Sequence, residues 1–330
     1  MQKIGVIGAG HLGKIHLRCI QSVPTLSLVG FFDTDKINAE KIANEFSSNA
    51  FESADELIDV VDIVDIVTPT IFHYKIAEAA IKKGKHVFIE KPLTHTVHEA
   101  KKLIALAEKY NIKVQVGHVE RFNPAFLSIK NMPLQPMFIE AHRLASFNPR
   151  GTDVSVILDL MIHDIDLILH VVKSDVKKIH ASGVSVVSAT PDIANVRLEF
   201  MNGCVANLTA SRISMKQMRK IRMFQEDAYI SLDFLEKSAQ LIRLHDEKVL
   251  TQFTPAERDT FMPFDSARGK RWLEIKNPEV PNINAIALEL SSFAEAIENN
   301  TTPLVSINDG FAALNVAHKI IKKIGDTKFS

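Results

Sequence analysis

The sequence has 330 residues, enough for two domains, and its 46% hydrophobic and 24% charged residues are typical of a folded, water-soluble chain. Lys plus Arg and Asp plus Glu number 39 each, so the formal net charge is zero and no overall positive field would attract nucleic acid or an acidic membrane. The two cysteines, Cys19 and Cys204, lie far apart, which predicts reduced thiols in a cytoplasmic protein.

The N-terminal third alternates between strand and helix patterns. Strand-like runs at 3–8, 26–33, 61–69, 86–92 and 112–118 are separated by helical patterns at 11–23, 36–46, 73–84 and 98–111. Because the first run follows Met1 directly, we expect no signal peptide. Strands separated by helices of this length predict βαβ units and a doubly wound parallel sheet with both faces covered.

The pattern changes after about residue 123. Strand-like runs follow one another without intervening helices at 136–144, 178–189, 195–211 and 228–234. The tripeptide MNG at 201–203 is a hairpin signal, so we predict a largely antiparallel sheet. Helical patterns return at 284–299 and 309–324, and the Pro-rich, charged stretch 254–282 is expected to be a long surface loop.

A glycine-rich turn joins the first strand to the first helix. Its GxGxxG pattern consists of Gly8, Ala9, Gly10, His11, Leu12 and Gly13. In a dinucleotide-binding turn the glycines permit a tight turn, close approach of the pyrophosphate and close packing of helix on sheet. Asp33, 20 residues after Gly13, ends the second strand, where a carboxylate binds ribose hydroxyls and repels a 2′-phosphate. NAD is therefore expected rather than NADP, while Asp35 either shares that role or caps the next helix.

The apolar segment LDLMIHDIDLILH at 158–170 contains five ionisable side chains, Asp159, His163, Asp164, Asp166 and His170. It could be a membrane span, a metal site or one face of a core helix. A charge at the bilayer centre costs about 2.5–3.5 kcal/mol, which disfavours a span. His and Asp are competent metal ligands, but no third or fourth ligand is evident, so we expect no metal. Helical spacing places all but Asp164 on one polar stripe of a core helix.

Several stretches resemble the Gfo/Idh/MocA oxidoreductases, which include glucose–fructose oxidoreductase and inositol dehydrogenase. They are GAGHLGKIH at 8–16, TPTIFHYKIA at 68–77, EKP at 90–92, VGHVERFNP at 116–124, and Asp159 with His163. The resemblance implies an NAD-binding Rossmann domain at 1–122 and an α+β domain at 123–330 for substrate binding and oligomerisation. In that family the second domain has a large, open, mostly antiparallel sheet through which dimers or tetramers form, and the nicotinamide lies between the domains beside the EKP lysine.

One departure concerns the substrate pocket. Many family members have glycines before the aspartate and between the aspartate and the histidine, whereas this chain has DVSV at 153–156 and Met161. Bulkier groups there would reshape the pocket floor. The combination of ERFNP, EAHR, FNPRGTDVS and DLMIHDID is similar to the branch acting on nucleotide-linked amino sugars, the UDP-N-acetylglucosamine 3-dehydrogenases.

Oxidation of a secondary alcohol requires a hydride acceptor, a base and a positive group for the developing alkoxide. Lys91 follows a parallel strand at the end where such sheets bind ligands, and the resemblance assigns it to the substrate hydroxyl and nicotinamide edge. His163 is the expected general base because imidazole titrates near neutral pH, with Asp159 holding it. Glu90 is expected to orient its neighbours. The alternatives are a surface lysine and a core histidine satisfied by a carboxylate.

Other side chains are secondary candidates. On the cofactor side they are Thr68, Pro69 and His73, and for His73 a structural role is equally consistent with the sequence. On the substrate side they are Arg121 and Asn123, with Arg143, Arg150 and Arg212 as bidentate partners for a diphosphate. For each arginine an ordinary surface role is equally consistent with the sequence. His11 and His16 are expected to line the first helix, and Asp166 and His170 to cap, pair or be solvated.

The sequence therefore favours an NAD-dependent dehydrogenase that oxidises a ring hydroxyl of a sugar or sugar nucleotide. A small molecule is the expected partner, with neither nucleic acid nor membrane. Two alternatives stay open: an NAD-sensing regulatory protein without catalysis, and an enzyme that recycles NAD during epimerisation, elimination or glycoside cleavage.

Overall fold

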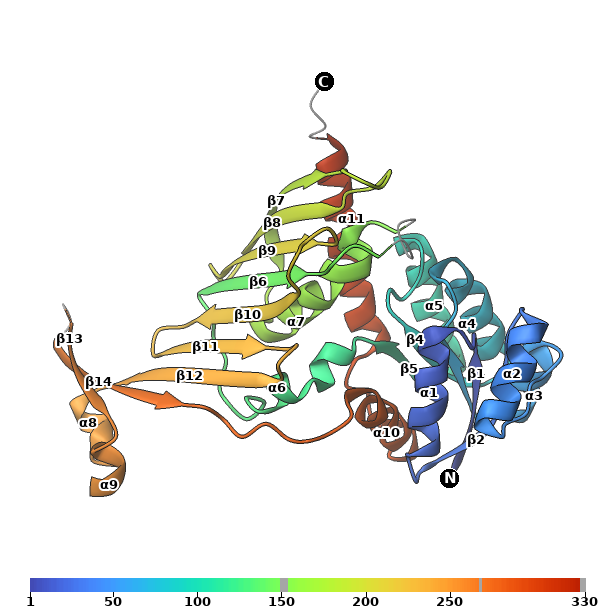
Figure 1. Ribbon diagram of the computed structural model, residues 1–330, viewed down its shortest axis with the longest axis horizontal. Coiled ribbons are helices and arrows are strands. Elements are labelled where there is room, and N and C mark those ends of the chain that lie inside the picture. The colour runs from blue at the N-terminus through green and yellow to red at the C-terminus, as the bar shows by residue number, and fades with distance from the viewer. Residues whose placement is uncertain (149–153, 267–268, 327–330) are drawn as a thin grey trace. The chain divides into compact units, whose positions relative to one another are not determined.

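The computed structural model describes residues 1–148, 154–266 and 269–326, which divide into two compact units (Figure 1). The first unit comprises 1–122 and 283–318, and the second comprises 123–282 and the chain from Lys319 onward. The chain leaves the first unit after residue 122, and residues 283–318 return to it. The cause is α10 (Ala285–Glu298), whose apolar side chains Leu290 and Phe293 join the core of the first unit.

The first unit has five parallel strands in the order β2-β1-β3-β4-β5. They are β1 (Gln2–Ile7), β2 (Leu26–Phe32), β3 (Ile63–Ile66), β4 (His86–Glu90) and β5 (Val114–Gly117). The α-helices between them are α1 (His11–Gln21), α2 (Lys36–Phe46), α3 (Ala54–Val60), α4 (His73–Lys82) and α5 (Val97–Tyr110). The strand order reverses at β1 and β3, the position where open α/β sheets bind ligands.

Alternation along β1 distributes the helices over both faces of this sheet. Ile4 and Val6 pack in one core with α1, α2 and α10. Gly5 points to the opposite face, where a side chain would meet Leu57 of α3 at 2.7 Å. The predicted parallel sheet with both faces covered is confirmed.

The second unit has nine strands in the order β13-β14-β12-β11-β10-β6-β9-β8-β7. Neighbouring strands are antiparallel, apart from the parallel pair β6 and β9. The strands are β6 (Phe138–Leu144), β7 (Val176–Val184), β8 (Ile193–Phe200), β9 (Val205–Ser211), β10 (Met218–Phe224), β11 (Ala228–Asp233), β12 (Ser238–His245), β13 (Met262–Ser266) and β14 (Gly269–Lys276). The predicted fold class, a parallel sheet followed by a mostly antiparallel one, is confirmed.

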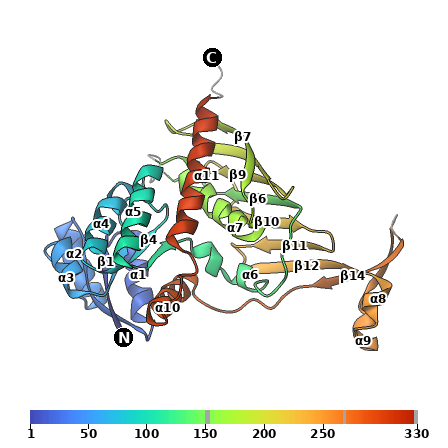
Figure 2. The same ribbon diagram turned by 180° about the vertical axis from the view of Figure 1, so that it is seen from behind.

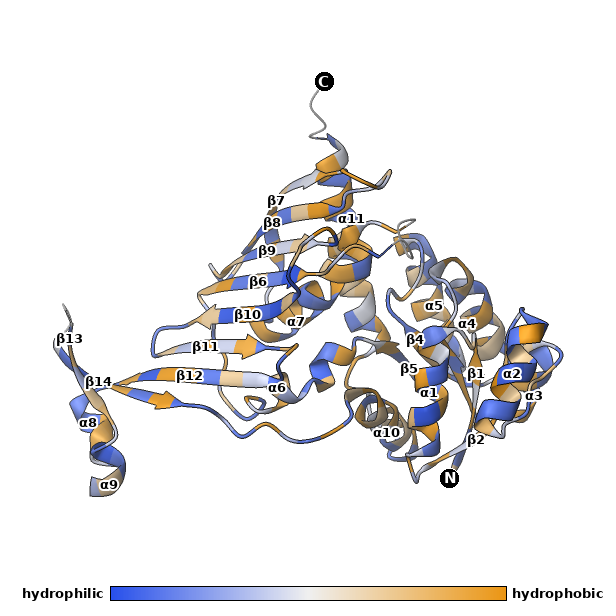
Figure 3. Cartoon of the chain, viewed as in Figure 1, coloured by the Kyte–Doolittle hydropathy of each residue, from blue (hydrophilic) through white to orange (hydrophobic). Residues whose placement is uncertain are grey.

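Helices cover one face of this second sheet. The helix α7 (Ile162–Val172), preceded by a π-helical turn (Ile157–Met161), lies across that face in Figure 2. Hydrophobic and hydrophilic residues alternate along the strands in Figure 3, as expected when one face is buried. The remaining helices are α6 (Pro124–Leu127), α8 (Glu247–Leu250), α9 (Pro255–Arg258) and α11 (Ile307–Asp326), with short 3₁₀ turns at Thr70–Phe72 and Val119–Phe122.

Two local predictions have opposite outcomes. The hairpin at 201–203 is confirmed, because it joins β8 to β9 with Gly203 at φ +89°. The surface loop predicted at 254–282 is wrong, since the stretch contains α9, β13 and β14. Strand β14 pairs with β12 along Leu241–His245, and Glu274 is its buried residue. Within the described residues no helix combines the length and the apolar character that a membrane span requires.

Candidate functional site

In the glycine turn after β1, the packing of the protein itself excludes a side chain at Gly8 and Gly13 but not at Gly10. A Cβ on Gly8, whose φ is +97°, would lie 2.6 Å from the carbonyl oxygen of Val67. A Cβ on Gly13 would collide with the carbonyl oxygen of Gly8. A Cβ on Gly10 would meet nothing within 4 Å. Gly8 and Gly13 thus shape the turn. Gly10 instead leaves the backbone accessible to an external phosphate, which fits a dinucleotide.

Asp33 follows β2 directly and is bonded to that turn. Its Oδ2 accepts a hydrogen bond from the amide of Ala9 at 2.7 Å, and its Oδ1 accepts one from the amide of Asp35 at 2.9 Å. Asp35 in turn caps α2 by accepting a bond from the amide of Asn38 at 3.0 Å. The structure therefore holds the Asp33 carboxylate at the turn and gives Asp35 a capping role. His11 and Leu12 are exposed at the start of α1.

His73 connects two loops of the first unit. It is buried at the start of α4, with Nε2 2.9 Å from the carbonyl oxygen of Thr68 and Nδ1 2.9 Å from that of Pro92. Burial lowers the pKa of His73, against the opposing effect of these hydrogen bonds. Of the two roles open for His73, the structural one is observed: it ties the loop containing Thr68 and Pro69 to the EKP turn.

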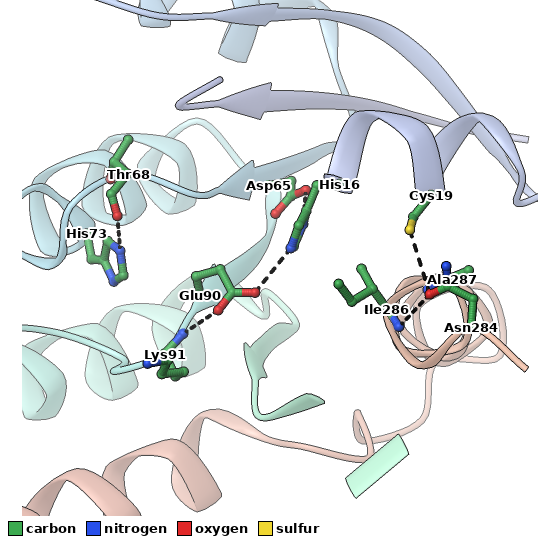
Figure 4. A network of polar contacts seen from close by, with 10 residues as sticks. All are labelled: His16, Cys19, Asp65, Thr68, His73, Glu90, Lys91, Asn284, Ile286 and Ala287. Atoms are coloured by element: carbon green, nitrogen blue, oxygen red, sulfur yellow. Dashed lines mark hydrogen bonds and ion pairs between the residues drawn. The ribbon is translucent and has the colours of Figure 1, made fainter. Parts of the chain in front are cut away.

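The EKP turn follows the end of β4. Glu90 is the last residue of that strand, and its Oε2 accepts a hydrogen bond from the backbone amide of Lys91 at 3.1 Å. The Lys91–Pro92 peptide bond is cis, and the Lys91 side chain is half-buried. Figure 4 shows Glu90 between Lys91 and His16, whose Nε2 lies 3.1 Å from Glu90 Oε1.

Three residues of this region were not among the predicted site residues. His16, expected only to line α1, is fully buried and bonds to both Asp65 and Glu90. Asp65 lies within the otherwise apolar strand β3, and a carboxylate in such a run was the available signal. Gly117 lies opposite Glu90 on β5, where a Cβ would be 2.8 Å from Glu90 Oε1.

The apolar segment 158–170 is a core helix, but its ionisable side chains differ in exposure. Asp159 is half-buried in the π-helical turn, a feature frequent at functional sites, and His163 is half-buried in the first turn of α7. Asp166 is buried, while His170 is exposed with its ring 6.0 Å from that of Phe126. The predicted polar stripe is thus not uniformly solvated.

Asp164, which lies off the predicted stripe, is buried in an ion pair with Arg143. Nη2 of Arg143 lies 2.8 Å from Asp164 Oδ1, and Nε lies 3.1 Å from both carboxylate oxygens. The physical reason is that a buried carboxylate needs a charged partner, which Arg143 on β6 provides.

A cavity of about 490 Å³ in the second unit contains three arginines. It is lined by Arg143, Arg212, Arg219 and Asp159, together with Leu144, Ala145, Ser146, Asn148, Leu160 and Gln217. Three of the predicted candidates, Asp159, Arg143 and Arg212, therefore line one cavity. Arg219 was missed, because a cationic residue on an alternating strand is usually solvated. Arg212 also donates from Nη2 to the carbonyl oxygen of Val154.

The remaining candidates make structural contacts. Buried Arg121 lies 3.2 Å from Asp309 Oδ1 and donates to the carbonyl oxygen of Leu304 at 3.2 Å, near the start of α11. Asn123 caps α6 through the amide of Ala125 at 3.0 Å. Arg150 lies outside the described residues. Among those described, no group of three or more His, Cys, Asp or Glu side chains is arranged to hold a metal ion.

Comparison with protein families identifies both parts of the chain. Residues 2–118 match the oxidoreductase family with an NAD-binding Rossmann fold, and residues 137–231 match the Gfo/Idh/MocA C-terminal domain. The chain belongs to the Gfo/Idh/MocA oxidoreductase family. It is an NAD-dependent dehydrogenase acting on CH–OH groups, which confirms the predicted family, enzyme class and cofactor.

Individual members of the Gfo/Idh/MocA family resemble this chain to different degrees. UDP-N-acetylglucosamine 3-dehydrogenase of Acidithiobacillus ferrooxidans is 40% identical over 240 residues, covering 72% of this chain and 76% of the relative. A solved structure of the enzyme of that name from the same organism superposes with a TM-score of 0.87 at 32% identity and covers 98% of each chain. The scyllo-inositol 2-dehydrogenase (NAD+) of Bacillus subtilis is 27% identical over 335 residues, covering 95% of this chain and 91% of the relative.

Proposed function

We propose that this dehydrogenase oxidises a secondary ring hydroxyl of a sugar nucleotide, and specifically the 3-hydroxyl of UDP-N-acetylglucosamine. The observation that carries the proposal is the cavity in which Arg143, Arg212 and Arg219 accompany Asp159. The 40% identical relative that bears this activity in its name supports the same substrate.

The cavity has the chemistry expected for an anionic substrate. Its volume of about 490 Å³ lies within the usual range of small-molecule sites. Asp164 engages Nε and Nη2 of Arg143, but each guanidinium has five N–H donors, and a diphosphate accepts such donors in pairs. Three cationic side chains in one cavity attract an anionic group, which a nucleotide-linked sugar carries and a neutral free sugar does not.

Lys91 is proposed to stabilise the alkoxide that develops on the substrate. The glycine turn and Asp33 would hold NAD, which would supply the hydride acceptor. Lys91 follows the carboxyl end of β4, and its backbone amide is held by Glu90, so the cation projects from a fixed point. His73 binds the carbonyl oxygen of Pro92 and fixes the same turn.

His163 is proposed to take the hydroxyl proton, and Asp159 to orient it. Asp159 in the π-helical turn lines the arginine cavity, and His163 follows four residues later at the start of α7. An imidazole can accept the proton and return it to solvent near neutral pH.

The substrate is tested by incubating the purified protein with NAD and either UDP-N-acetylglucosamine or free N-acetylglucosamine, while the absorbance of reduced nicotinamide is recorded. We expect reduction with the sugar nucleotide only, and its loss in Lys91→Ala and His163→Ala. Arg219→Met should raise KM for the sugar nucleotide about tenfold or more, because a charge-assisted hydrogen bond is lost. The matched control is Arg222→Met on the same strand, whose partner is Glu140. No reduction with any UDP-sugar, or turnover without net reduction of NAD, would contradict the proposal.

We also propose that copies of the chain associate through the outward face of the nine-stranded sheet. Phe138, Phe224 and Tyr229 occupy paired positions there, with ring centroids 5.8 and 5.0 Å apart in succession. Phe224 is 38% exposed, and covering such an aromatic row is favourable. Light scattering should give a dimer or tetramer, which Phe224→Lys weakens; a monomeric wild-type protein would contradict this.

A further inference from the structure

A buried histidine in the first unit bridges two carboxylates. The His16 side chain on α1 is inaccessible to solvent, with Nδ1 2.9 Å from Asp65 Oδ2 on β3 and Nε2 3.1 Å from Glu90 Oε1 on β4 (Figure 4). The ring of Phe88 packs edge-on against it at 5.8 Å. An imidazole donates from both nitrogens only when protonated, so this geometry favours the imidazolium.

The charges around His16 favour the same protonation state. Burial alone would lower the pKa of His16, but the charges and hydrogen bonds of Asp65 and Glu90 raise it well above its usual value. Burial raises the pKa of Asp65. For Glu90 burial acts in the same direction, but His16 and the charge of Lys91 lower its pKa overall. The hydrogen-bond geometry and the neighbouring charges thus both favour a protonated His16 opposite an ionised Glu90.

The other oxygen of Glu90 holds the residue proposed to act on substrate. Oε2 accepts the backbone amide of Lys91, so one carboxylate connects the His16 ring to the first residue after β4. Gly117 on the adjacent strand leaves the space for this carboxylate, because a Cβ there would lie 2.8–3.0 Å from its atoms. The Glu90 side chain is thus confined between the histidine and the neighbouring strand.

The hydrogen bonds of this cluster reach beyond the ion pair. They continue from the His16 ring through the Glu90 carboxylate to the backbone amide of Lys91. Asp65 lies on the opposite side of the ring from Glu90 and has no such link to Lys91. Both carboxylates are buried and both contact His16, but only Glu90 also accepts the backbone amide of Lys91.

We propose that His16 is a positioning residue for the reaction: by anchoring Glu90 it fixes the Lys91 backbone and so the direction of the Lys91 side chain. This inference rests on the proposed role of Lys91. Misplacing a reacting group by about 1 Å costs on the order of 100-fold in rate, so loss of the anchor should reduce kcat rather than the affinity for NAD.

The test compares His16→Asn and Glu90→Ala with the matched control Asp65→Asn. The first two variants should lower kcat by about 10- to 100-fold with the dissociation constant of NAD unchanged, while Asp65→Asn stays near the wild-type kcat. In protein labelled with ¹⁵N-lysine and free of ligands, the amide of Lys91 should exchange with solvent faster in His16→Asn and Glu90→Ala, but not in Asp65→Asn. The Lys91→Arg variant identifies the resonance.

The outcomes separate this inference from the proposed function. If Lys91→Ala retains wild-type activity, the role of Lys91 fails. If Lys91→Ala is inactive but Glu90→Ala leaves kcat and the Lys91 amide unchanged, the role of Lys91 stands and positioning through Glu90 is overturned. Equal effects of Asp65→Asn and Glu90→Ala on kcat and amide exchange would reduce the cluster to a structural ion pair and overturn it as well. If His16→Asn does not fold, Glu90→Ala alone tests the positioning role, because it removes the carboxylate that joins the His16 ring to the Lys91 amide.

Discussion

Arg143 on β6 and Asp164 on α7 form a buried ion pair in which Nε and Nη2 of the guanidinium lie 2.8–3.1 Å from the carboxylate oxygens. Both residues are only 3% exposed. The pair joins the central region of the nine-stranded sheet to the helix that contains His163. Arg143 also lines the arginine cavity, so Asp164 fixes the direction of a proposed substrate-binding residue.

We therefore predict that Asp164→Ala lowers the free energy of unfolding by about 3–5 kcal/mol, because it leaves the Arg143 cation buried without its partner. The measurement is urea-induced unfolding. Glu140→Ala on the same strand is the matched control, since its half-exposed pair with Arg222 contributes less than about 1 kcal/mol. Equal losses in the two variants would show that the buried pair is not a stabilising contact.

The glycine turn predicts opposite behaviour for two alanine variants. Gly10→Ala should keep the unfolding temperature of the wild type without NAD, because its φ of −67° suits alanine and a Cβ there meets no protein atom within 4 Å. Its affinity for NAD should fall at least about tenfold, since the methyl group occupies the approach of the pyrophosphate. Gly13→Ala should instead lose about 1–3 kcal/mol of stability through its collision with Gly8. Calorimetry and NAD titration measure the two effects; unchanged NAD binding in Gly10→Ala would place the cofactor elsewhere.

Asp33 is predicted to select NAD. Asp33→Ser removes the carboxylate that we expect to bind the ribose hydroxyls, so kcat/KM with NAD should fall and the ratio for NADP over NAD should rise at least about tenfold. Asp35→Ser is the control, because serine still caps α2 and the structure gives Asp35 only that capping role. A larger change of cofactor ratio in Asp35→Ser than in Asp33→Ser would reverse the assignment.

Local sequence patterns predicted the elements whose causes are local. The glycine turn, the parallel sheet and the hairpin at 201–203 each depend on neighbouring residues, and all are present. The contact between His16 and Glu90 joins residues 74 apart, and that between Gln115 and the α10 residue Glu289 joins residues 174 apart. No periodicity along α1 indicates which carboxylate its histidine will meet, because the strand order that brings β4 beneath α1 is a property of the whole sheet.

The same limit explains the errors in the second unit. The strand β14 looked like a loop because KRWLEIK is rich in charged residues, and only its pairing with β12 shows that it is a strand. The ion-pair partner of Asp164 was not predicted, because Arg143 is 21 residues earlier, on a strand. Helical spacing locates a side chain on its own helix, but its function depends on what packs opposite.

The loop between β7 and β8 depends on one carboxylate. Oδ2 of buried Asp192 accepts the amides of Val186 and Val187 at 2.7 Å and that of Ser188 at 3.0 Å. Burial alone would raise the pKa of Asp192, but the hydrogen bonds from Ser188, Val187 and Val186 outweigh it and hold that pKa far below its usual value. The carbonyl oxygen of Asp192 also accepts the amide of Arg212 at 2.9 Å, which connects this loop to the arginine cavity.

Because the pKa of Asp192 is lower in the folded than in the unfolded protein, its ionised form stabilises the fold at pH values above the unfolded value of about 3.9. That contribution is lost as the pH falls below it, when the unfolded chain takes up a proton that the folded chain does not. Asp192→Asn should therefore be less stable than the wild type at neutral pH, and the difference in the free energy of unfolding should shrink as the pH falls below about 4. Urea unfolding of both proteins from neutral to acid pH measures this difference. A difference that stays constant over the whole range would mean that the oxygen atoms of Asp192, and not its charge, hold the loop.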